Sequence, residues 1–234
     1  MKKIVFLLIT CVLNLAHADD GVYALNDVCD GFGCFSGDTG GLPITIANSG
    51  SYILTSNLVS SSETVNVIEI TADNVTLDLN GFSIIGPRTC TGSNDTLSCT
   101  NAGMTASAIL AAGRSNVVIK NGITQGFDTG VRLTSTSQRG NVVHHANSSQ
   151  NEFGFVMING MISDSTANLN LDTGFSNGLF GTLFVRDSFA FGNGLRSAFA
   201  FTCSNVMFSN NGSDADCQRY TNESTCGNGL TACP

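Results

Sequence analysis

The sequence has no tryptophan, three tyrosines, three prolines and little positive charge. Carbohydrate-binding surfaces built on flat Trp and Tyr rings therefore have few candidate residues here. Apart from Lys2 and Lys3, eight basic residues stand against eighteen acidic ones, and Lys120 is the last lysine. Such an acidic chain disfavours nucleic acid, anionic membranes and other polyanions as partners. No window repeats its apolar residues with a helical period over three turns, which argues against long helices.

The first eighteen residues have the pattern of a cleavable export signal. A basic start at Lys2 and Lys3 is followed by an apolar run over residues 4–15 and a small-x-small cleavage site, Ala16-His17-Ala18. The apolar run is too short to span a bilayer. We therefore expect a bacterial-type signal peptide at 1–18 and a periplasmic or secreted mature protein with no membrane span.

Eight cysteines follow the export signal, an even number that suits disulfide bonding in an oxidising compartment. Two pairs are close in sequence and four cysteines gather near the end of the chain: Cys29 and Cys34, Cys90 and Cys99, then Cys203, Cys217, Cys226 and Cys233. Local disulfides are the prediction, with the connectivity of the last four left open. Zinc is the alternative, and it lacks the paired Cys-x-x-Cys spacing and nearby histidines that such sites use.

A repeat organises most of the chain, and its template is the segment 116–133. Two β-branched or aliphatic runs are joined there by the corner Asn121-Gly122 and by a glycine-rich turn. Corner residues two positions after a large apolar residue recur in steps of 24, 19, 23 and 23: Asn121, His145, Asp164, Asp187 and Asn210. A second column runs in phase with the first: Gly130-Val131, Gly154-Phe155, Gly174-Phe175 and Ala198-Phe199. Two columns in phase predict a repeat protein.

Each repeat contains short runs of strand length, so the pattern predicts an all-β solenoid of stacked parallel coils. Corner asparagines would hydrogen-bond from coil to coil, and Phe155, Phe175 and Phe199 would stack in the interior. We expect four segments: the signal peptide, an irregular N-terminal cap at 19–42, the solenoid at 43–212 with a surface-loop insertion at 88–104, and a Cys-rich C-terminal cap at 213–234. Caps are needed because open ends of the stack expose strand edges.

Segments 70–86 and 116–127 resemble repeats of the right-handed parallel β-helix family, the pectate-lyase-like superfamily. The resemblance covers roughly residues 43–212 and implies a single-stranded right-handed parallel β-helix of about seven coils with disulfide-pinned caps. Members of that superfamily include polysaccharide lyases, polygalacturonase-type hydrolases, mannuronan epimerases and proteins with no known reaction. The resemblance therefore implies a fold rather than an activity.

The corner column carries the candidate chemistry. Asp164 and Asp187 would lie in adjacent coils with His145 beside them, where two carboxylates share a proton or hold a cation such as calcium, or work with the histidine in acid–base catalysis. The alternative, which we favour, is that Asp and His replace Asn in a turn ladder that bonds backbone amides. His144 and His145 are adjacent, so on a strand they would face opposite sides and would not share a metal ion.

Lyases of the superfamily use an arginine or lysine base with acidic calcium ligands, which makes Arg132 and Arg186 the candidate bases. The chain has no lyase motif, no clustered aspartates of the polygalacturonase kind and no Asp-Pro-His-Asp of the epimerases. The prediction is thus an exported, non-catalytic and monomeric binding or structural protein at the cell envelope, with a polysaccharide as partner and no required cofactor. The alternative is a small polysaccharide lyase or glycoside hydrolase that uses Asp164, Asp187, His145 and an arginine, with calcium.

Overall fold

The computed structural model describes residues 21–35, 37–135, 140–178, 181–194, 196–200, 202–212, 216–217, 220–221 and 225–226. The predicted signal peptide at 1–18 and Cys233 lie outside these ranges. The described chain is all-β apart from α1 (Cys29–Phe32) and the 3₁₀ helix η1 (Asn94–Thr96). Within it, neither helix has the length and apolar character needed to cross a membrane.

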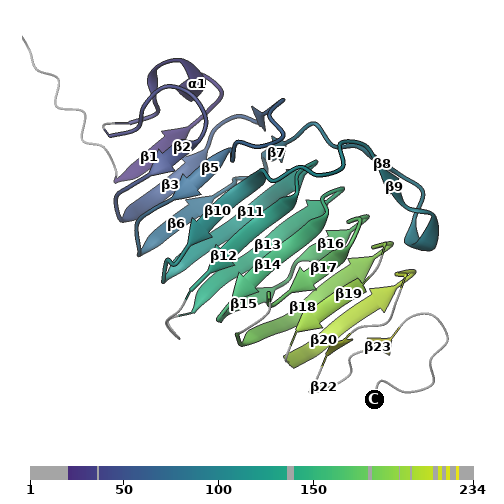
Figure 1. Cartoon of the computed structure of the whole chain (residues 1–234). Helices are drawn as coiled ribbons and strands as arrows, with labels where there is room; N and C mark the ends of the chain where they lie inside the picture. Colours follow the sequence, from purple (N-terminus) through teal and green to yellow (C-terminus); the bar gives the residue numbers. More distant parts are fainter. Residues whose placement is uncertain are drawn as a thin grey trace, which may run out of the picture.

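The larger of two parallel sheets has thirteen strands and forms one side of the stack (Figure 1). They are β1 (Val22–Leu25), β3 (Gly50–Leu54), β4 (Leu58–Val59), β6 (Val75–Asp78), β7 (Ser83–Ile85), β11 (Val117–Gln125), β13 (Asn141–Ser149), β15 (Gly160–Ser163), β16 (Thr166–Asn168), β18 (Leu183–Phe191), β20 (Thr202–Ser209), β22 (Tyr220–Thr221) and β23 (Thr225–Cys226).

The second parallel sheet has eight strands and takes one strand from each successive repeat. They are β2 (Ile44–Ile46), β5 (Ile68–Ile70), β10 (Ser107–Ala112), β12 (Thr129–Thr134), β14 (Phe153–Ile158), β17 (Thr173–Ser176), β19 (Arg196–Ala200) and β21 (Asp216–Cys217). The chain alternates between the two sheets, and each strand pairs with its counterpart one repeat later. This arrangement is compatible with a parallel β-helix.

In-register pairing places like residues over like residues, and the apolar columns face inward. One interior column contains five fully buried residues: Ile119, Val143, Ile162, Val185 and Cys203. Burial of an aliphatic side chain of this size contributes about 1.5–3 kcal/mol. The first step of the predicted phenylalanine stack is present, with the rings of Phe155 and Phe175 5.5 Å apart and 9° from parallel. The side chain of Phe199 lies outside the described part of the chain.

The repeat register differs from the sequence prediction near the C-terminal end. Phe175 pairs with Ala198, so Phe199 lies one position further along β19. Val185 pairs with Cys203, which makes Asn205 the partner of Asp187 in place of Asn210. The apolar-x-Asn pattern occurs twice in this region, and the buried Cys203 fills the position of the large apolar residue.

The N-terminal segment is more regular than expected, because β1 pairs in parallel with β3 and extends the larger sheet. Its four residues are too few to reveal a period in the sequence. Cys29 and Cys34 form the predicted local disulfide, and the rings of Tyr23, Phe35 and Tyr52 pack 5.2–5.3 Å apart over the same end.

The insertion at 88–104, here called the strap, is closed by the second predicted disulfide, Cys90–Cys99. These cysteines lie in the antiparallel pair β8 (Cys90–Thr91) and β9 (Ser98–Cys99), at the side of the stack in Figure 1. The strap also contacts later repeats, since the amide of Asn94 donates to the carbonyl of Gly192. Cys203 is disulfide-bonded as well. The side chains of Cys217 and Cys226 lie outside the described part of the chain.

A buried asparagine ladder runs along one turn of the stack. It consists of four residues from successive repeats: Asn151, Asn170, Asn193 and Asn211. The backbone N–H of each of the first three donates to the side-chain oxygen of the next, at 2.9–3.1 Å. Their side-chain amides also donate to carbonyls of neighbouring strands. The coil-to-coil ladder that the sequence suggested therefore exists, but at this turn and not at the column of Asn121.

Asn170→Ala should destabilise the fold, because it leaves the buried amide of Asn151 without its acceptor. The expected loss in the free energy of unfolding is about 2 kcal/mol or more, measured by urea denaturation. Asn48→Ala is the matched control: Asn48 is exposed, and its change should stay within about 0.5 kcal/mol. Equal effects of the two substitutions would contradict a structural role for the ladder.

Candidate functional site

Six stacked turn residues form what we call the outer corner of the thirteen-stranded sheet. All have positive φ, between 47° and 59°: Asn80, Asn121, His145, Asp164, Asp187 and Asn205. Asn, Asp and His are the non-glycine residues that most readily accept this left-handed conformation. Backbone geometry therefore explains which residue types occur at the corner. It does not explain why their side chains point outward.

The side chains of the outer corner are exposed at His145, Asp164, Asp187 and Asn205. Among the described residues, no backbone amide donates to the carboxylate of Asp164 or Asp187. The amide of Asn205 donates to Asp187 Oδ1 at 2.8 Å, along the stack. Asn80 Nδ2 donates to the carbonyl of Leu54, but among the described residues from His145 to Asn205 the outer corner lacks the side chain-to-backbone ladder that the sequence favoured. The polar groups of that part are exposed to solvent.

Two shallow depressions of about 520 and 480 Å³ lie beside the outer corner. Both are lined by His145, Asp164 and Thr166, so they adjoin at these residues, and we call the two depressions together the trough. The trough runs from Asn121 to Asn205, along the axis on which the repeats stack. Its polar wall is the outer corner itself.

In the later repeats, two large apolar side chains, Phe189 and Met207, line the trough. Phe189 lies between Thr166 and Met207 in the parallel register, and all three line the second depression. The ring of Phe189 is nearly parallel to that of Phe191, with 6.0 Å between centroids and 12° between planes. Met207 is 53% exposed and Phe191 37%. Phe189 itself is half-buried, so part of its ring faces solvent beside the exposed Phe191, and such a surface suits a ligand with an apolar face.

His144 and His145 contact each other, contrary to the prediction from strand alternation. The left-handed φ of His145 breaks the alternation, and the two Nδ1 atoms lie 2.9 Å apart. The pKa of His144 is lowered by burial, then by the charges of His145 and Lys120, while Asp164 and Asp78 act in the opposite direction.

An ion pair lies beside Asn121, at the end of the trough in the earlier repeats. Lys120 Nζ lies 3.2 Å from Asp78 Oδ2, and the side-chain amide of Asn121 donates to the same carboxylate. Partial burial alone would raise the pKa of Asp78, but hydrogen bonds from Asn80, Asn121 and Lys120 outweigh it and the net shift is downward. The carboxylate of Asp78 is therefore already bonded to the side chains of Lys120 and Asn121.

The structure brings together some of the predicted site residues and separates another. His145, Asp164 and Asp187 line the trough, and Arg186 is exposed on β18 beside Asp187. Arg132 is on the other sheet, in β12, where its guanidinium lies 3.5 Å from Asp128. Within the described ranges no three His, Cys, Asp or Glu side chains gather closely enough to hold a metal ion. The calcium hypothesis therefore rests on Asp164 and Asp187 alone.

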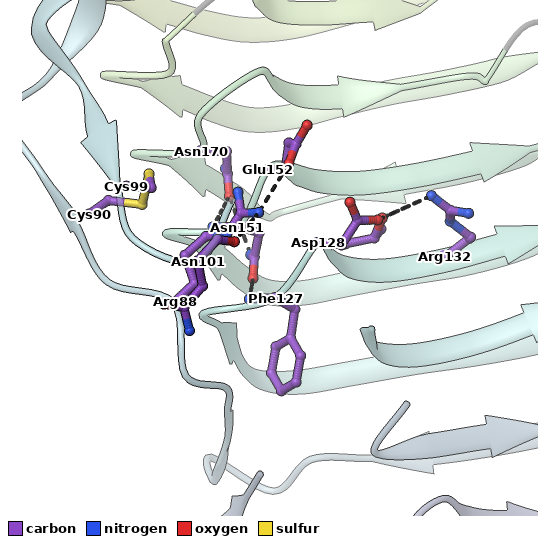
Figure 2. Close-up of polar contacts among 11 residues, drawn as sticks. Arg88, Cys90, Cys99, Asn101, Phe127, Asp128, Arg132, Asn151, Glu152 and Asn170 are labelled. Atoms are coloured by element: carbon purple, nitrogen blue, oxygen red, sulfur yellow. Dashed lines mark hydrogen bonds and ion pairs between the residues drawn. A yellow bond between two sulfur atoms is a disulfide. The ribbon is translucent and has the colours of Figure 1, made fainter. Parts of the chain in front are cut away.

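A second polar cluster, at the root of the strap, is absent from the sequence prediction. Arg88 is 2% exposed, and its Nη2 donates to the carbonyl of Asn101 and to Glu152 Oε2 at 3.0 Å (Figure 2). Its Nε and Nη1 have no hydrogen-bond partner among the described residues. The only signal in the sequence is that Arg88 is the sole basic residue of the insertion. Arg88 joins the strap to Glu152, the residue just before β14, and we call this contact the clasp.

Asp128 lies beside this clasp and bonds with Arg132 and Thr129, as Figure 2 shows for the arginine. The pKa of Asp128 is raised, chiefly by burial. The nearby Glu152 carboxylate also raises it, while Thr129, Arg132 and Arg88 lower it. The cluster holds two cations and two carboxylates that pair as Arg88 with Glu152 and Arg132 with Asp128, which is typical of a structural network.

No protein-family model, curated protein or solved structure matches this chain. The described structure defines the protein as an all-β chain of large parallel sheets with local disulfides. Its open polar and aromatic surface is the trough.

Glu152→Ala should destabilise the protein by about 3 kcal/mol, because it leaves the buried charge of Arg88 uncompensated. The double variant Arg88→Met with Glu152→Ala should recover most of that loss, since it removes the charge as well. Urea denaturation of both variants measures the difference. Glu69→Ala, at a half-buried carboxylate of β5, is the control. A Glu152→Ala effect no larger than the control would contradict the clasp.

Asp128→Asn should stabilise the protein at pH 7 relative to wild type by up to about 1 kcal/mol. Because the folded pKa of Asp128 is raised, its stabilising contribution is present below the unfolded pKa and is lost as pH rises through the folded value. The asparagine mimics the protonated form, so the advantage should be greater at pH 7 than at pH 3.5. Urea denaturation at the two pH values tests this, and the reverse order would refute it.

Proposed function

We propose that the chain is an exported right-handed parallel β-helix protein of the pectate-lyase-like kind that binds an extended, neutral glycan in the trough without transforming it. The observation that carries the proposal is the combination in one trough of the outward Phe189 ring with a row of exposed carboxylate, amide and imidazole groups. A pyranose presents an apolar C–H face and a rim of hydroxyls. An aromatic ring suits the face, and Asp187 and Asn205 suit the rim.

The direction of the trough supports an extended ligand. Corresponding side chains recur along the stack at roughly the strand spacing of 4.8 Å, and a ligand that lies along this axis meets similar groups at each step. Net acidity favours a neutral glycan, because uronate polymers would be repelled. We place the protein in the periplasm or outside the cell, as a monomer at the envelope.

A catalytic role is the second candidate, and the shared exposure of Asp164, Asp187, His145 and Arg186 favours it. A lyase or hydrolase of this kind would need an acid and a base on either side of one bond. Lyase chemistry would add calcium at Asp164 and Asp187. The products of a catalytic role, which are unsaturated ends from a lyase or new reducing ends from a hydrolase, distinguish that role from binding alone.

The test is calorimetric titration of the mature protein with cello-, manno-, xylo- and laminarihexaose and with polygalacturonate, with and without calcium. At least one neutral hexasaccharide should bind, and polygalacturonate should not. Phe189→Ala should weaken that binding roughly threefold to tenfold, the value of one aromatic contact. Phe184→Ala is the matched control, because Phe184 is a half-buried phenylalanine of the same strand that does not line the trough.

The proposed glycan binding is contradicted if no neutral hexasaccharide binds. It is also contradicted if Phe189→Ala binds as tightly as wild type while Phe189→Ala and Phe184→Ala both remain folded. Chromatography of the same mixtures after long incubation covers the alternative. Unsaturated or shortened products that disappear in Asp187→Asn would replace the binding role by a catalytic one.

A further inference from the structure

The pair His144 and His145 is the feature of the trough that glycan binding does not explain. Their ring centroids are 5.2 Å apart and their Nδ1 atoms 2.9 Å apart, so the two nitrogens lie between the rings, head to head. A metal ion needs about 2.0–2.1 Å to each imidazole nitrogen, and two nitrogens that face each other at this distance leave no room for one. A single proton fits between them.

The number of protons on the two rings determines whether the contact between the two Nδ1 atoms can form. One Nδ1 must donate and the other must accept, so the contact requires at least one unprotonated Nδ1. Two imidazolium rings would present two donors and two positive charges to each other. The contact is therefore available to the pair when it is neutral or singly charged, and it is lost when both rings are charged.

Charged groups surround the pair on both sides along the stack. Lys120 on β11 is the register partner of His144, and Asp78 on β6 lies behind Lys120. On the other side Ser163 of β15 is the partner of His144, followed by Arg186 of β18. Asp164 stands next to His145 at the outer corner, and both line the two depressions. Asp164 is thus the carboxylate at the junction of the trough.

We propose that the His144–His145 pair makes ligand binding sensitive to acid: a second proton separates the rings and turns His145 onto the carboxylate of Asp164, which occupies the junction of the trough and releases the ligand. This inference rests on the proposed function and adds its regulation. Burial and the charges of His145 and Lys120 lower the pKa of His144. The ordinary pKa of histidine is about 6.5, so release occurs at a pH below that value. At neutral pH the trough is open.

The shared proton can be tested without any ligand. The only other histidine, His17, is in the predicted signal peptide, so the mature chain labelled with ¹⁵N-histidine gives signals from this pair alone. Titration from pH 8 to pH 4 should show two protonation steps separated by more than about one pH unit. His145→Asn, which suits a left-handed corner as Asn121 does, should leave a single step. Two independent steps at the ordinary histidine pKa would overturn the pair.

The release step is tested by calorimetry with the neutral hexasaccharide that binds best at pH 7.5. Its dissociation constant should rise at least about fivefold at pH 5.0 in the wild type, as expected when a hydrogen bond to a carboxylate is lost. In His145→Asn the constant should be the same at both pH values. An unchanged wild-type constant overturns the release step while glycan binding stands. Failure of every hexasaccharide to bind at pH 7.5 overturns the proposed function and the release together, and the titration still decides the shared proton.

Discussion

Parallel pairing of each strand with its counterpart one repeat later is the constraint on which the rest of the structure depends. Once Ile119 lies over Val143 and Val143 over Ile162, every other position is fixed as an inward or an outward column. Inward columns become apolar because one polar residue would be buried among several apolar ones. Outward columns carry no such requirement. Polar side chains that could bind a ligand are therefore expected in outward columns. At the outer corner the backbone conformation also restricts which residue types occur.

The two turns solve the same backbone problem with opposite consequences. At the turn of Asn151, Asn170 and Asn193 the side chains are buried, so each amide must find partners, and the ladder provides them. At the outer corner the side chains reach water, and the only remaining demand is tolerance of a positive φ. Asn, His and Asp all meet this demand. That freedom explains the change from Asn121 to His145 and Asp164, and it explains why the polar groups of the trough stand free of the backbone.

The sequence predicted the features that repeat or lie close together in the chain, and it missed contacts between distant segments. The positions of Asn121, His145, Asp164 and Asp187 followed from the period, and the disulfides Cys29–Cys34 and Cys90–Cys99 from proximity. Asn205 was missed because a shorter connection changes the step from 23 to 18 residues, which no local pattern announces. The clasp of Arg88 was missed because its partner, Glu152, is 64 residues away. Contacts of that kind depend on how the strap folds back.

We propose that the outer corner recognises a ligand without transforming it. Hydrolysis needs two carboxyl groups in different environments, one kept protonated and one ionised. Asp164 and Asp187 occupy equivalent places in successive repeats, and both are exposed, so burial does not set one carboxyl group apart from the other. They differ only in their neighbours, which are His145 for Asp164 and Asn205 for Asp187. The same repetition suits a ligand that is itself a repeat. The histidine pair breaks the repetition of the outer corner, because the side chain of His145 contacts that of its neighbour in sequence, His144. The departure from repetition thus lies at the junction of the trough, which is where we propose that one proton controls the release of a ligand.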